Sequence, residues 1–254
     1  MRTAQDHDHL SYSQINCFLT CSLRYKFQYV DTIPPAFTPV SLAFGVAIHE
    51  AAAAYYQTRL EGDELNPDQL WDVYRDCWQR AEKIKYFNGD NEKSLTEKAK
   101  NMLTVFHESR DPSITVLGVE EFFQLPLGGV PPLEGYIDLI EQTPDGTITL
   151  VDLKTAAKKL SDSNAHSSIQ LTAYALGAET LGFDPDALNM RLDVVTKTKS
   201  PEMLTYETTR TDDERHRFVR LVYGIWNAIE REAFFPREDW HCAQCAWAQN
   251  CREW

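Results

Sequence analysis

The sequence has little glycine or proline and no long apolar run. Glycine and proline number only 11 and 12 of 254 residues, too few for a fibrous or low-complexity protein. No segment approaches the roughly 18 consecutive apolar residues of a membrane-spanning helix. The first ten residues also lack the basic-then-apolar pattern of a secretion leader. Because 43% of the residues are hydrophobic and 11% aromatic, we expect a folded cytoplasmic protein with a packed core and no membrane segment.

Positive charge is scarce as well. Lys and Arg number 25 against 38 Asp and Glu, which gives a formal net charge of −13. Neutralisation of phosphates is the main source of nonspecific nucleic-acid binding, so this balance argues against a protein that coats DNA or RNA. It remains compatible with an enzyme that holds DNA locally through divalent cations, since clustered carboxylates are ligands for such ions.

The hydrophobic pattern predicts a helical first part followed by a strand-rich centre. A capping box of Ser11 and Gln14 is expected to open a helix that runs to about Val30. The further predicted helices cover residues 41–60, the segment from Pro67, and residues 92–108, 167–181 and 212–232. The predicted strands cover residues 114–125, 133–141, 147–154, 188–198 and 202–208.

This order of elements predicts an α/β fold with a central mixed sheet flanked by helices. We expect one domain over residues 1–254. Within it, residues 10–110 form a mainly helical part, residues 111–210 the core sheet, and residues 211–254 a helix with a cysteine-rich tail.

One predicted hairpin brings two carboxylates and a lysine together. In its turn, Pro144-Asp145-Gly146, proline sets the first φ and glycine supplies the left-handed residue. Such a loop places Asp138 opposite Asp152, with Cβ atoms about 4.5–5.5 Å apart. Lys154 points to the same face because it lies two residues further on. The pattern predicts a cation site; the alternative is a solvated face with a surface ion pair, although opposed carboxylates repel one another without a cation.

These residues and several motifs along the chain resemble the PD-(D/E)xK nuclease superfamily. The likeness is to its RecB-family exonuclease branch, which includes CRISPR-adaptation nucleases with an iron–sulfur cluster. The matching segments are residues 10–16 through Cys21, Phe44-Gly45 with His49-Glu50, Glu120 with residues 123–127, Gly135 with Asp138, Asp152 with Lys154-Thr155, Gln170 with Tyr174, and Cys242-x2-Cys245 with Cys251. The sequence departs from the family pattern at Ser22, Ile137 and Leu153, none of which supplies a side chain to the chemistry.

The resemblance implies a catalytic set of Asp138, Asp152 and Lys154 that hydrolyses phosphodiesters with Mg²⁺ or Mn²⁺. The two acids, His49 and the Leu153 carbonyl would hold the metal, and the imidazole makes Mn²⁺ a suitable activator. Lys154 would orient or deprotonate the attacking water, or stabilise the transition state. The alternative for His49 is an ordinary core or surface histidine.

Three further residues are expected to contact DNA. Gln170 could donate to a phosphate or to metal-bound water, and Tyr174 could stack on a base or bond the DNA backbone. The alternative is a helix that simply packs Tyr174 into the core. Glu120 could contact substrate or add a carboxylate to the metal site. Its alternative role is that of a solvent-facing strand residue.

The cysteines indicate a second metal site. Cys242, Cys245 and Cys251 supply three thiols within ten residues. The resemblance implies Cys21 as the fourth ligand, with Cys17 as the competitor, while Cys77 is expected to be a buried thiol. Four thiolates suit either Zn²⁺ or an iron–sulfur cluster, and the resemblance implies a [4Fe–4S] cluster. Its role would be structural, because it would join the first helix to the last ten residues.

The resemblance implies a metal-dependent deoxyribonuclease, an exonuclease on single-stranded DNA ends that serves DNA repair or defence. One alternative is a non-catalytic DNA-end-binding iron–sulfur module of a larger complex, and another is a trimming nuclease that works with CRISPR integration proteins. The presence of His49, Asp138, Asp152 and Lys154 favours catalysis. The sequence has no Gly-x4-Gly-Lys-Ser/Thr loop, so any unwinding would need a helicase partner.

Overall fold

A six-stranded mixed sheet lies at the centre of the computed structural model, which describes residues 8–254. The prediction about a secretion leader concerns the first ten residues, and most of these, residues 1–7, lie outside the described residues. The strand order is β1-β5-β6-β7-β8, and β4 pairs with β5. The strands are β1 (Leu10–Ser11), β4 (Thr115–Leu125), β5 (Leu133–Gln142), β6 (Ile148–Ala156), β7 (Leu188–Thr196) and β8 (Met203–Thr208). The pairs β1–β5 and β6–β7 are parallel and the others antiparallel. The predicted α/β fold with a central mixed sheet is confirmed.

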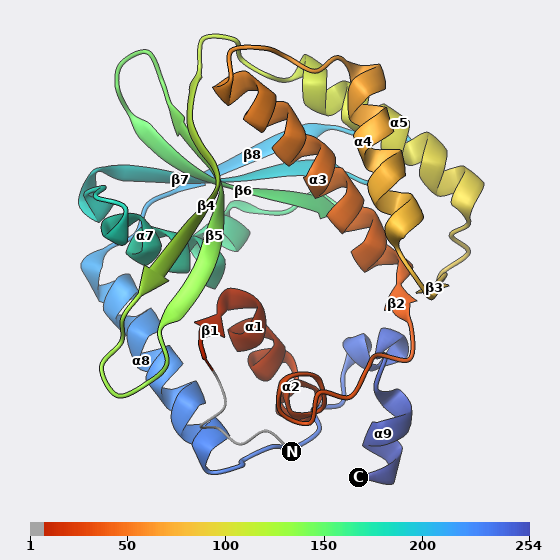
Figure 1. Cartoon of the computed structure of the whole chain (residues 1–254), viewed down its shortest axis with the longest axis vertical. Coiled ribbons are helices and arrows are strands. Elements are labelled where there is room, and N and C mark those ends of the chain that lie inside the picture. The colour runs from red at the N-terminus through yellow and green to blue at the C-terminus, as the bar shows by residue number, and fades with distance from the viewer. Residues whose placement is uncertain (1–7) are drawn as a thin grey trace.

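Helices cover both faces of this sheet, in two groups that Figure 1 shows apart from one another. On one face, α3 (Val40–Leu60), α4 (Pro67–Arg80) and α5 (Glu92–Glu108) share a core with Leu139 and Val151. On the other face, α7 (Ile169–Thr180) and α8 (Asp212–Glu230) share a core with Ile140 and Leu150. Both faces of the β5–β6 hairpin are therefore buried. Smaller elements are β2 (Thr38–Pro39), β3 (Ile84–Lys85), α6 (Asp162–His166) and α9 (Ala248–Glu253).

The first predicted helix is interrupted, which corrects the expectation of one helix to about Val30. Helix α1 (Tyr12–Thr20) ends before Cys21, whose backbone is extended (φ −163°, ψ 108°), and α2 (Ser22–Tyr25) continues into a π-helical segment, Lys26–Val30. The cause is a distant contact: Ser22 Oγ donates to the Phe235 carbonyl (3.1 Å) and accepts from the Phe235 amide (2.9 Å). The other predicted elements are confirmed, with boundaries shifted by one or two residues.

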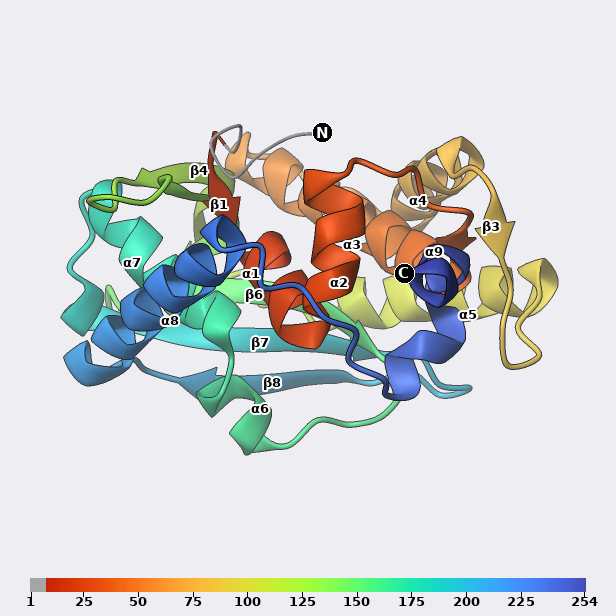
Figure 2. The ribbon, with the colours of Figure 1, turned by 90° about the horizontal axis from the view of Figure 1, so that it is seen from below.

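The two ends of the described chain pack against each other. The segment that follows α8 runs back beside α2 before it forms α9 (Figures 1 and 2). Leu23 and Phe27 form a small core with Ala246 and Trp247, and the Trp247 indole donates to the Ile33 carbonyl (2.9 Å). Within residues 8–254, none of the helices combines the length and apolar character that crossing a membrane requires.

Candidate functional site

The register predicted for the hairpin is confirmed. Thr143 N donates to Thr147 O (3.0 Å) and Gly146 has φ +91°. The β5–β6 ladder ends where Leu139 faces Val151, so Asp138 and Asp152 are the next residues along the diverging strands. Asp138 is 7% exposed and Asp152 fully buried. The alternative of a solvated face with a surface ion pair is therefore wrong.

Three donors hold the Asp138 carboxylate. Tyr174 Oη donates to Oδ1 (2.6 Å), the Leu153 amide donates to Oδ2 (2.9 Å), and His49 Nε2 lies 3.0 Å from Oδ2. Burial alone would raise the pKa of Asp138, but the His49 hydrogen bond and charge, with Lys154 and Tyr174, lower it below the usual value. Asp138 is therefore an oriented, ionised carboxylate.

Asp152 has fewer hydrogen-bond donors around its carboxylate than Asp138 has. Lys154 Nζ lies 2.7 Å from Oδ1, but within residues 8–254 neither Asp152 oxygen accepts a well-formed hydrogen bond. Burial, followed by repulsion from Asp138, raises the pKa of Asp152 to about 7 despite the nearby ammonium. Buried carboxylate oxygens are normally satisfied, so this pair of oxygens fits a ligand for a cation.

Lys154 remains an ammonium at this position. Burial alone would lower its pKa, but the charges of Asp152 and Asp138 outweigh that effect and raise it. Its Nζ also donates to Gln170 Oε1 (2.8 Å). Asp152 and Lys154 thus present opposite charges side by side, as predicted for two residues that are two positions apart on a strand.

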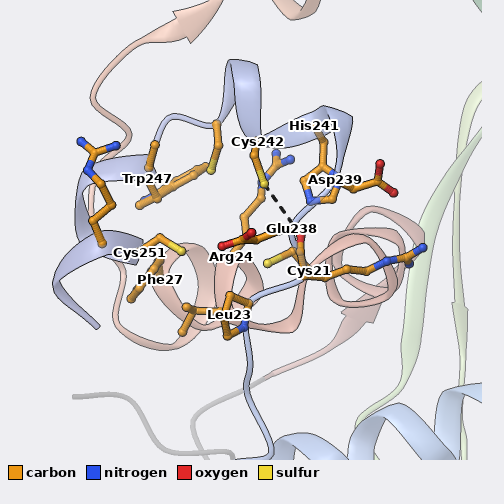
Figure 3. Close-up of a pocket in the computed structure, with 15 residues that line it drawn as sticks. Cys21, Leu23, Arg24, Phe27, Glu238, Asp239, His241, Cys242, Trp247 and Cys251 are labelled. Atoms are coloured by element: carbon orange, nitrogen blue, oxygen red, sulfur yellow. Dashed lines mark hydrogen bonds between the residues drawn. The ribbon is translucent and has the colours of Figure 1, made fainter.

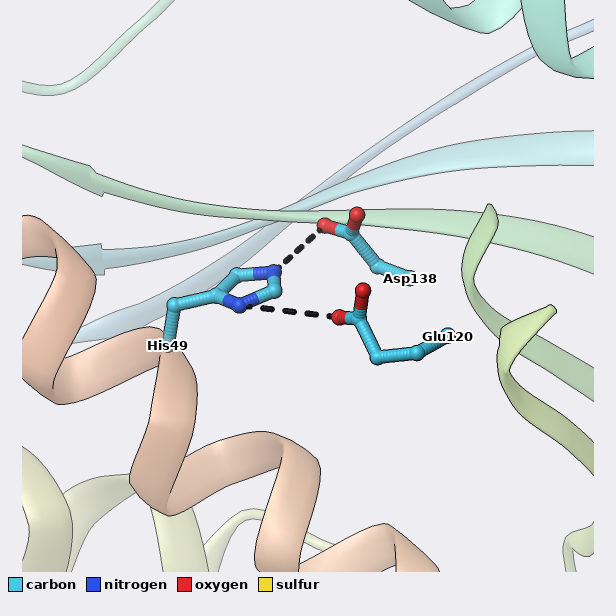
Figure 4. Close-up of side chains that lie close together, drawn as sticks. All are labelled: His49, Glu120 and Asp138. Atoms are coloured by element: carbon cyan, nitrogen blue, oxygen red, sulfur yellow. Dashed lines mark ion pairs between the residues drawn. The ribbon is translucent and has the colours of Figure 1, made fainter. Parts of the chain in front are cut away.

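His49 and Glu120 reach the same point from other elements. Figure 4 shows the imidazole of His49, on α3, facing the carboxylates of Glu120 on β4 and Asp138 on β5. His49 Nδ1 lies 3.7 Å from Glu120 Oε1, and the three side chains offer ligand atoms that all lie within 4.8 Å of one another. Burial alone would lower the pKa of His49, but Asp138 and then Glu120 raise it. These residues fit the donor set of Mg²⁺ or Mn²⁺.

A backbone irregularity aims Glu120 at this cluster. Glu120 has φ +51°, in the left-handed region, and the β4–β5 ladder pairs the residues on either side of it but not Glu120 itself. Such a conformation is costly for a residue other than glycine and is typical of functional sites. The next side chain, Glu121, folds over Gly118, where an added Cβ would come within 2.5 Å of Glu121 Cγ. Periodicity alone could not have revealed this bend.

Gln170 and Tyr174 occupy buried positions on α7, where they are 9% and 3% exposed. Gln170 accepts from Lys154 and its Nε2 donates to Tyr174 Oη (3.0 Å), which donates in turn to Asp138. The expectation that Tyr174 stacks on a base is wrong, because α7 packs against this face of the sheet and buries the ring. The pair links Lys154 to Asp138 through hydrogen bonds.

The four cysteines of the predicted cluster line one pocket of about 380 Å³. Figure 3 shows the sulfurs of Cys21, Cys242 and Cys251 directed toward a common space, and Cys245 lines the same pocket. Cys21 stands at the break between α1 and α2. Cys17 instead lies in the main core, where burial raises its thiol pKa to about 11. The geometry favours Cys21 over Cys17, since Cys17 is not among the residues that line this pocket.

Cys77 is only partly buried, where a buried thiol was expected. It packs beside Trp71 and Trp78 against the core under α3.

Comparison with known proteins agrees with these observations. The model of the PD-(D/E)XK nuclease superfamily matches residues 9–252. Proteins from three strains of Streptococcus agalactiae, each named as one subunit of an ATP-dependent helicase/deoxyribonuclease, are 24% identical over 177 residues, which is 65% of this chain. The chain spans only 16% of the length of these relatives.

The fold resembles a solved structure as well. A crystal structure from Eubacterium rectale, described as a candidate exonuclease, superposes with a TM-score of 0.60 at 14% identity and covers 97% of this chain and 88% of its own. That likeness concerns the fold. Because the family model matches nearly the whole chain, the chain belongs to the PD-(D/E)XK nuclease superfamily.

Proposed function

We propose that this chain is a divalent-metal-dependent deoxyribonuclease that acts as an exonuclease on single-stranded DNA ends. One observation carries the proposal: Asp152 is a fully buried carboxylate without well-formed hydrogen bonds in residues 8–254, beside the ionised and oriented Asp138. Lys154 is the one charged partner described for Asp152, and the repulsion between the two buried carboxylates costs stability that a bound metal ion would restore. The names of the relatives, a helicase/deoxyribonuclease component and a candidate exonuclease, support the substrate and the mode.

The metal-binding residues would be Asp138, Asp152 and His49, with Glu120 as a further carboxylate and the Leu153 carbonyl as a backbone ligand. Mg²⁺ or Mn²⁺, when bound, acidifies a water and offsets the charge of the phosphate. Two roles were expected for Glu120, a substrate contact or a further carboxylate at the metal, and the position of its carboxylate against His49 supports the second. Tyr174 and the Leu153 amide would keep Asp138 aimed at the metal.

Lys154 would serve as a fixed cation. Its raised pKa argues against a role as general base. Its ammonium is held between Asp152 Oδ1 and Gln170 Oε1, so it would orient the attacking water or stabilise the charge of the transition state. Gln170 is a positioning residue in this scheme.

The second part of the proposal is a [4Fe–4S] cluster held by Cys21, Cys242, Cys245 and Cys251. Zn–S bonds of about 2.3 Å would bring tetrahedral ligand sulfurs to about 3.8 Å from one another. Within residues 8–254, no three of the cysteine sulfurs lie within 4.8 Å of one another. Sulfurs at this spacing fit a single tetrahedral zinc ion less well, and the resemblance of the cysteine tail to that of the nuclease family supports the cluster. We expect anaerobically purified protein to be brown and to contain iron and sulfide; a colourless protein with one zinc per chain would contradict this.

One substrate panel tests the nuclease proposal. Circular and linear, single- and double-stranded DNA, labelled at either end, are incubated with Mg²⁺ and with Mn²⁺. We expect metal-dependent release of short products from linear single strands. Lys154→Gln should abolish activity, whereas Lys159→Gln, at an exposed lysine paired with Glu202, should not. Full activity of the Lys154 variant would exclude this site.

A helicase partner is proposed from the relatives. They are named as parts of a helicase/deoxyribonuclease and are far longer than this chain, and the chain itself has no nucleotide-binding loop of the Gly-x4-Gly-Lys-Ser/Thr type. Copurification with a helicase would support this. Copurification with CRISPR integration proteins would instead indicate a trimming nuclease of the same chemistry.

A further inference from the structure

Two exposed aromatic side chains lie beside the candidate site and are not used in the chemistry above. Phe122 on β4 and Tyr136 on β5 are cross-strand partners, and they are 46% and 56% exposed. Their ring centroids are 5.3 Å apart with an interplanar angle of 55°. Neighbouring Phe123 is 2% exposed in the core, so the strand already fills the core without Phe122. An exposed aromatic pair of this kind is typical of a binding surface.

The pair forms a wall of a cavity that reaches the catalytic hairpin. This cavity, of about 470 Å³, is lined by Phe122, Tyr136 and Ser13 and also by Asp138 and Gln170. Tyr136 and Asp138 are two residues apart on β5, about 7 Å along the strand, and both line this cavity. This distance corresponds to one or two nucleotides of a DNA strand.

A second groove also borders the site. It is about 490 Å³ in volume and is lined by His49 and Lys154, by exposed Leu42 and Val46 on α3, and by Ser13, which also lines the aromatic cavity. The candidate catalytic residues therefore lie between an aromatic cavity and an aliphatic groove. This arrangement fits a strand that crosses the site from one to the other.

Charge in the aromatic cavity does not favour phosphate binding. Of the described residues that line it, none is Lys or Arg, and its His9 lies 3.7 Å from Glu134. Attraction for DNA there must come from stacking, which is insensitive to charge and accepts every base. The overall net charge of −13 agrees with this.

We propose that Phe122 and Tyr136 form a platform on which one unpaired base next to the scissile phosphate stacks. The proposal rests on the nuclease function above and deepens it, because it names what selects a single strand. Inside a duplex both faces of a base are covered by neighbouring base pairs, so away from a duplex end only an unpaired base can present a face to the platform. The platform takes the stacking role that the buried Tyr174 cannot fill.

The test combines the double variant Phe122→Ala/Tyr136→Ala with an abasic scan. A single abasic site is moved along a single-stranded oligonucleotide, one position at a time. Wild-type protein should show a local drop in kcat/KM at one position next to the cut. The double variant should lose roughly 10- to 100-fold in kcat/KM on the intact strand, as expected for one lost stacking contact, and should no longer respond to the abasic position.

Three controls test whether the loss of activity is due to the loss of the two aromatic rings. Tyr86→Ala, at an exposed tyrosine that lines neither the aromatic cavity nor the aliphatic groove, should leave kcat/KM unchanged. Phe122→Tyr should retain the activity and the abasic profile, because it keeps an aromatic ring. The melting temperature of the double variant, and its rise with Mn²⁺, should match those of the wild type, which shows that fold and metal site are intact.

Binding measured in Ca²⁺ separates this proposal from the nuclease function. An oligonucleotide with 2-aminopurine at the sensitive position, or at each position in turn, reports stacking by fluorescence quenching without cleavage. Quenching that requires both rings supports the platform even if no DNA is cut, in which case only the nuclease function fails. Equal quenching and equal kcat/KM in the wild type and the double variant would overturn the platform while leaving the nuclease function intact.

Discussion

The buried Asp152 carboxylate should destabilise the protein when no cation is bound. Burial and the neighbouring Asp138 raise the pKa of Asp152 from 3.8 to about 7. Each pKa unit corresponds to about 1.36 kcal/mol, so at pH 8 the ionised group costs the folded state on the order of 4 kcal/mol. The folded state binds this proton more tightly than the unfolded state. The cost is therefore absent below about pH 4, grows between about pH 4 and 7, and is complete above pH 7.

Asp152→Asn removes the charge while keeping nearly the same shape. In EDTA at pH 8 we expect the variant to melt on the order of 5–10 °C higher than the wild type, from 2–4 °C per kcal/mol for a chain of this size. The gain in stability is smaller than the full cost of the buried charge, because Lys154 loses its partner in the variant. That loss is limited, since the Lys154 side chain is 39% exposed and water can solvate its ammonium. At pH 5 the difference should shrink to less than half.

Mn²⁺ should remove the advantage of the variant. At a concentration of 100 Kd the ion stabilises a protein that binds it by about 2.7 kcal/mol, and the variant should gain little because one ligand has lost its charge. The control is Asp213→Asn on α8, where the carboxylate is exposed; it should change neither measurement. A variant that melts lower than the wild type in EDTA at both pH values would show that Asp152 serves as a structural partner of Lys154. Equal stabilisation of both proteins by Mn²⁺ would refute Asp152 as a ligand.

Three further predictions concern the residues that support the site and the salt dependence of DNA binding. Arg191→Met should lower the free energy of unfolding by about 3–5 kcal/mol in urea titrations, because Arg191 lies 2.6 Å from both Glu141 and Asp193, which would stay buried without it; a loss below about 1 kcal/mol would contradict this. Gly118→Ala should cost about 1–3 kcal/mol and weaken Mn²⁺ binding, because its Cβ would displace Glu121; unchanged Mn²⁺ affinity in calorimetry would count against the role of this bend. The affinity for single-stranded DNA in Ca²⁺ should fall with salt at a log–log slope shallower than about −2, at about −0.7 per phosphate contact, and a much steeper slope would point to a basic surface.

The hairpin could be predicted from sequence because its determinants are local. Proline and glycine in the turn set the register within a few residues, and the register then places Asp138 opposite Asp152. Glu120 illustrates what could not be predicted. Its left-handed backbone breaks the alternation on which strand prediction depends, and nothing in the neighbouring residue types signals it. Its position against His49 follows from the packing of α3 beside β4, which is a tertiary contact.

The helix break at Cys21 and the burial of Tyr174 also result from tertiary contacts. The helix propensity of residues 11–30 continues through Cys21, but Ser22 exchanges hydrogen bonds with Phe235, more than 200 residues away. Tyr174 is four residues from Gln170 on one helix face, which sequence alone makes equally suitable for DNA or for the core. Only the placement of α7 against the hairpin shows that this face points inward.

The charges of the site imply that metal and DNA bind cooperatively. Asp138, Asp152 and Glu120 would repel a phosphate placed among them, at about 4 kcal/mol for two unit charges 4 Å apart at an effective dielectric constant of 20. A divalent cation relieves both this repulsion and the repulsion that raises the pKa of Asp152. Because binding free energies are reciprocal, single-stranded DNA must then raise the affinity for Ca²⁺ by the same factor by which Ca²⁺ raises the affinity for DNA. Calorimetric titrations in both orders measure the two factors. Equal DNA affinity in EDTA and in Ca²⁺ would place the DNA away from these carboxylates and would contradict the site.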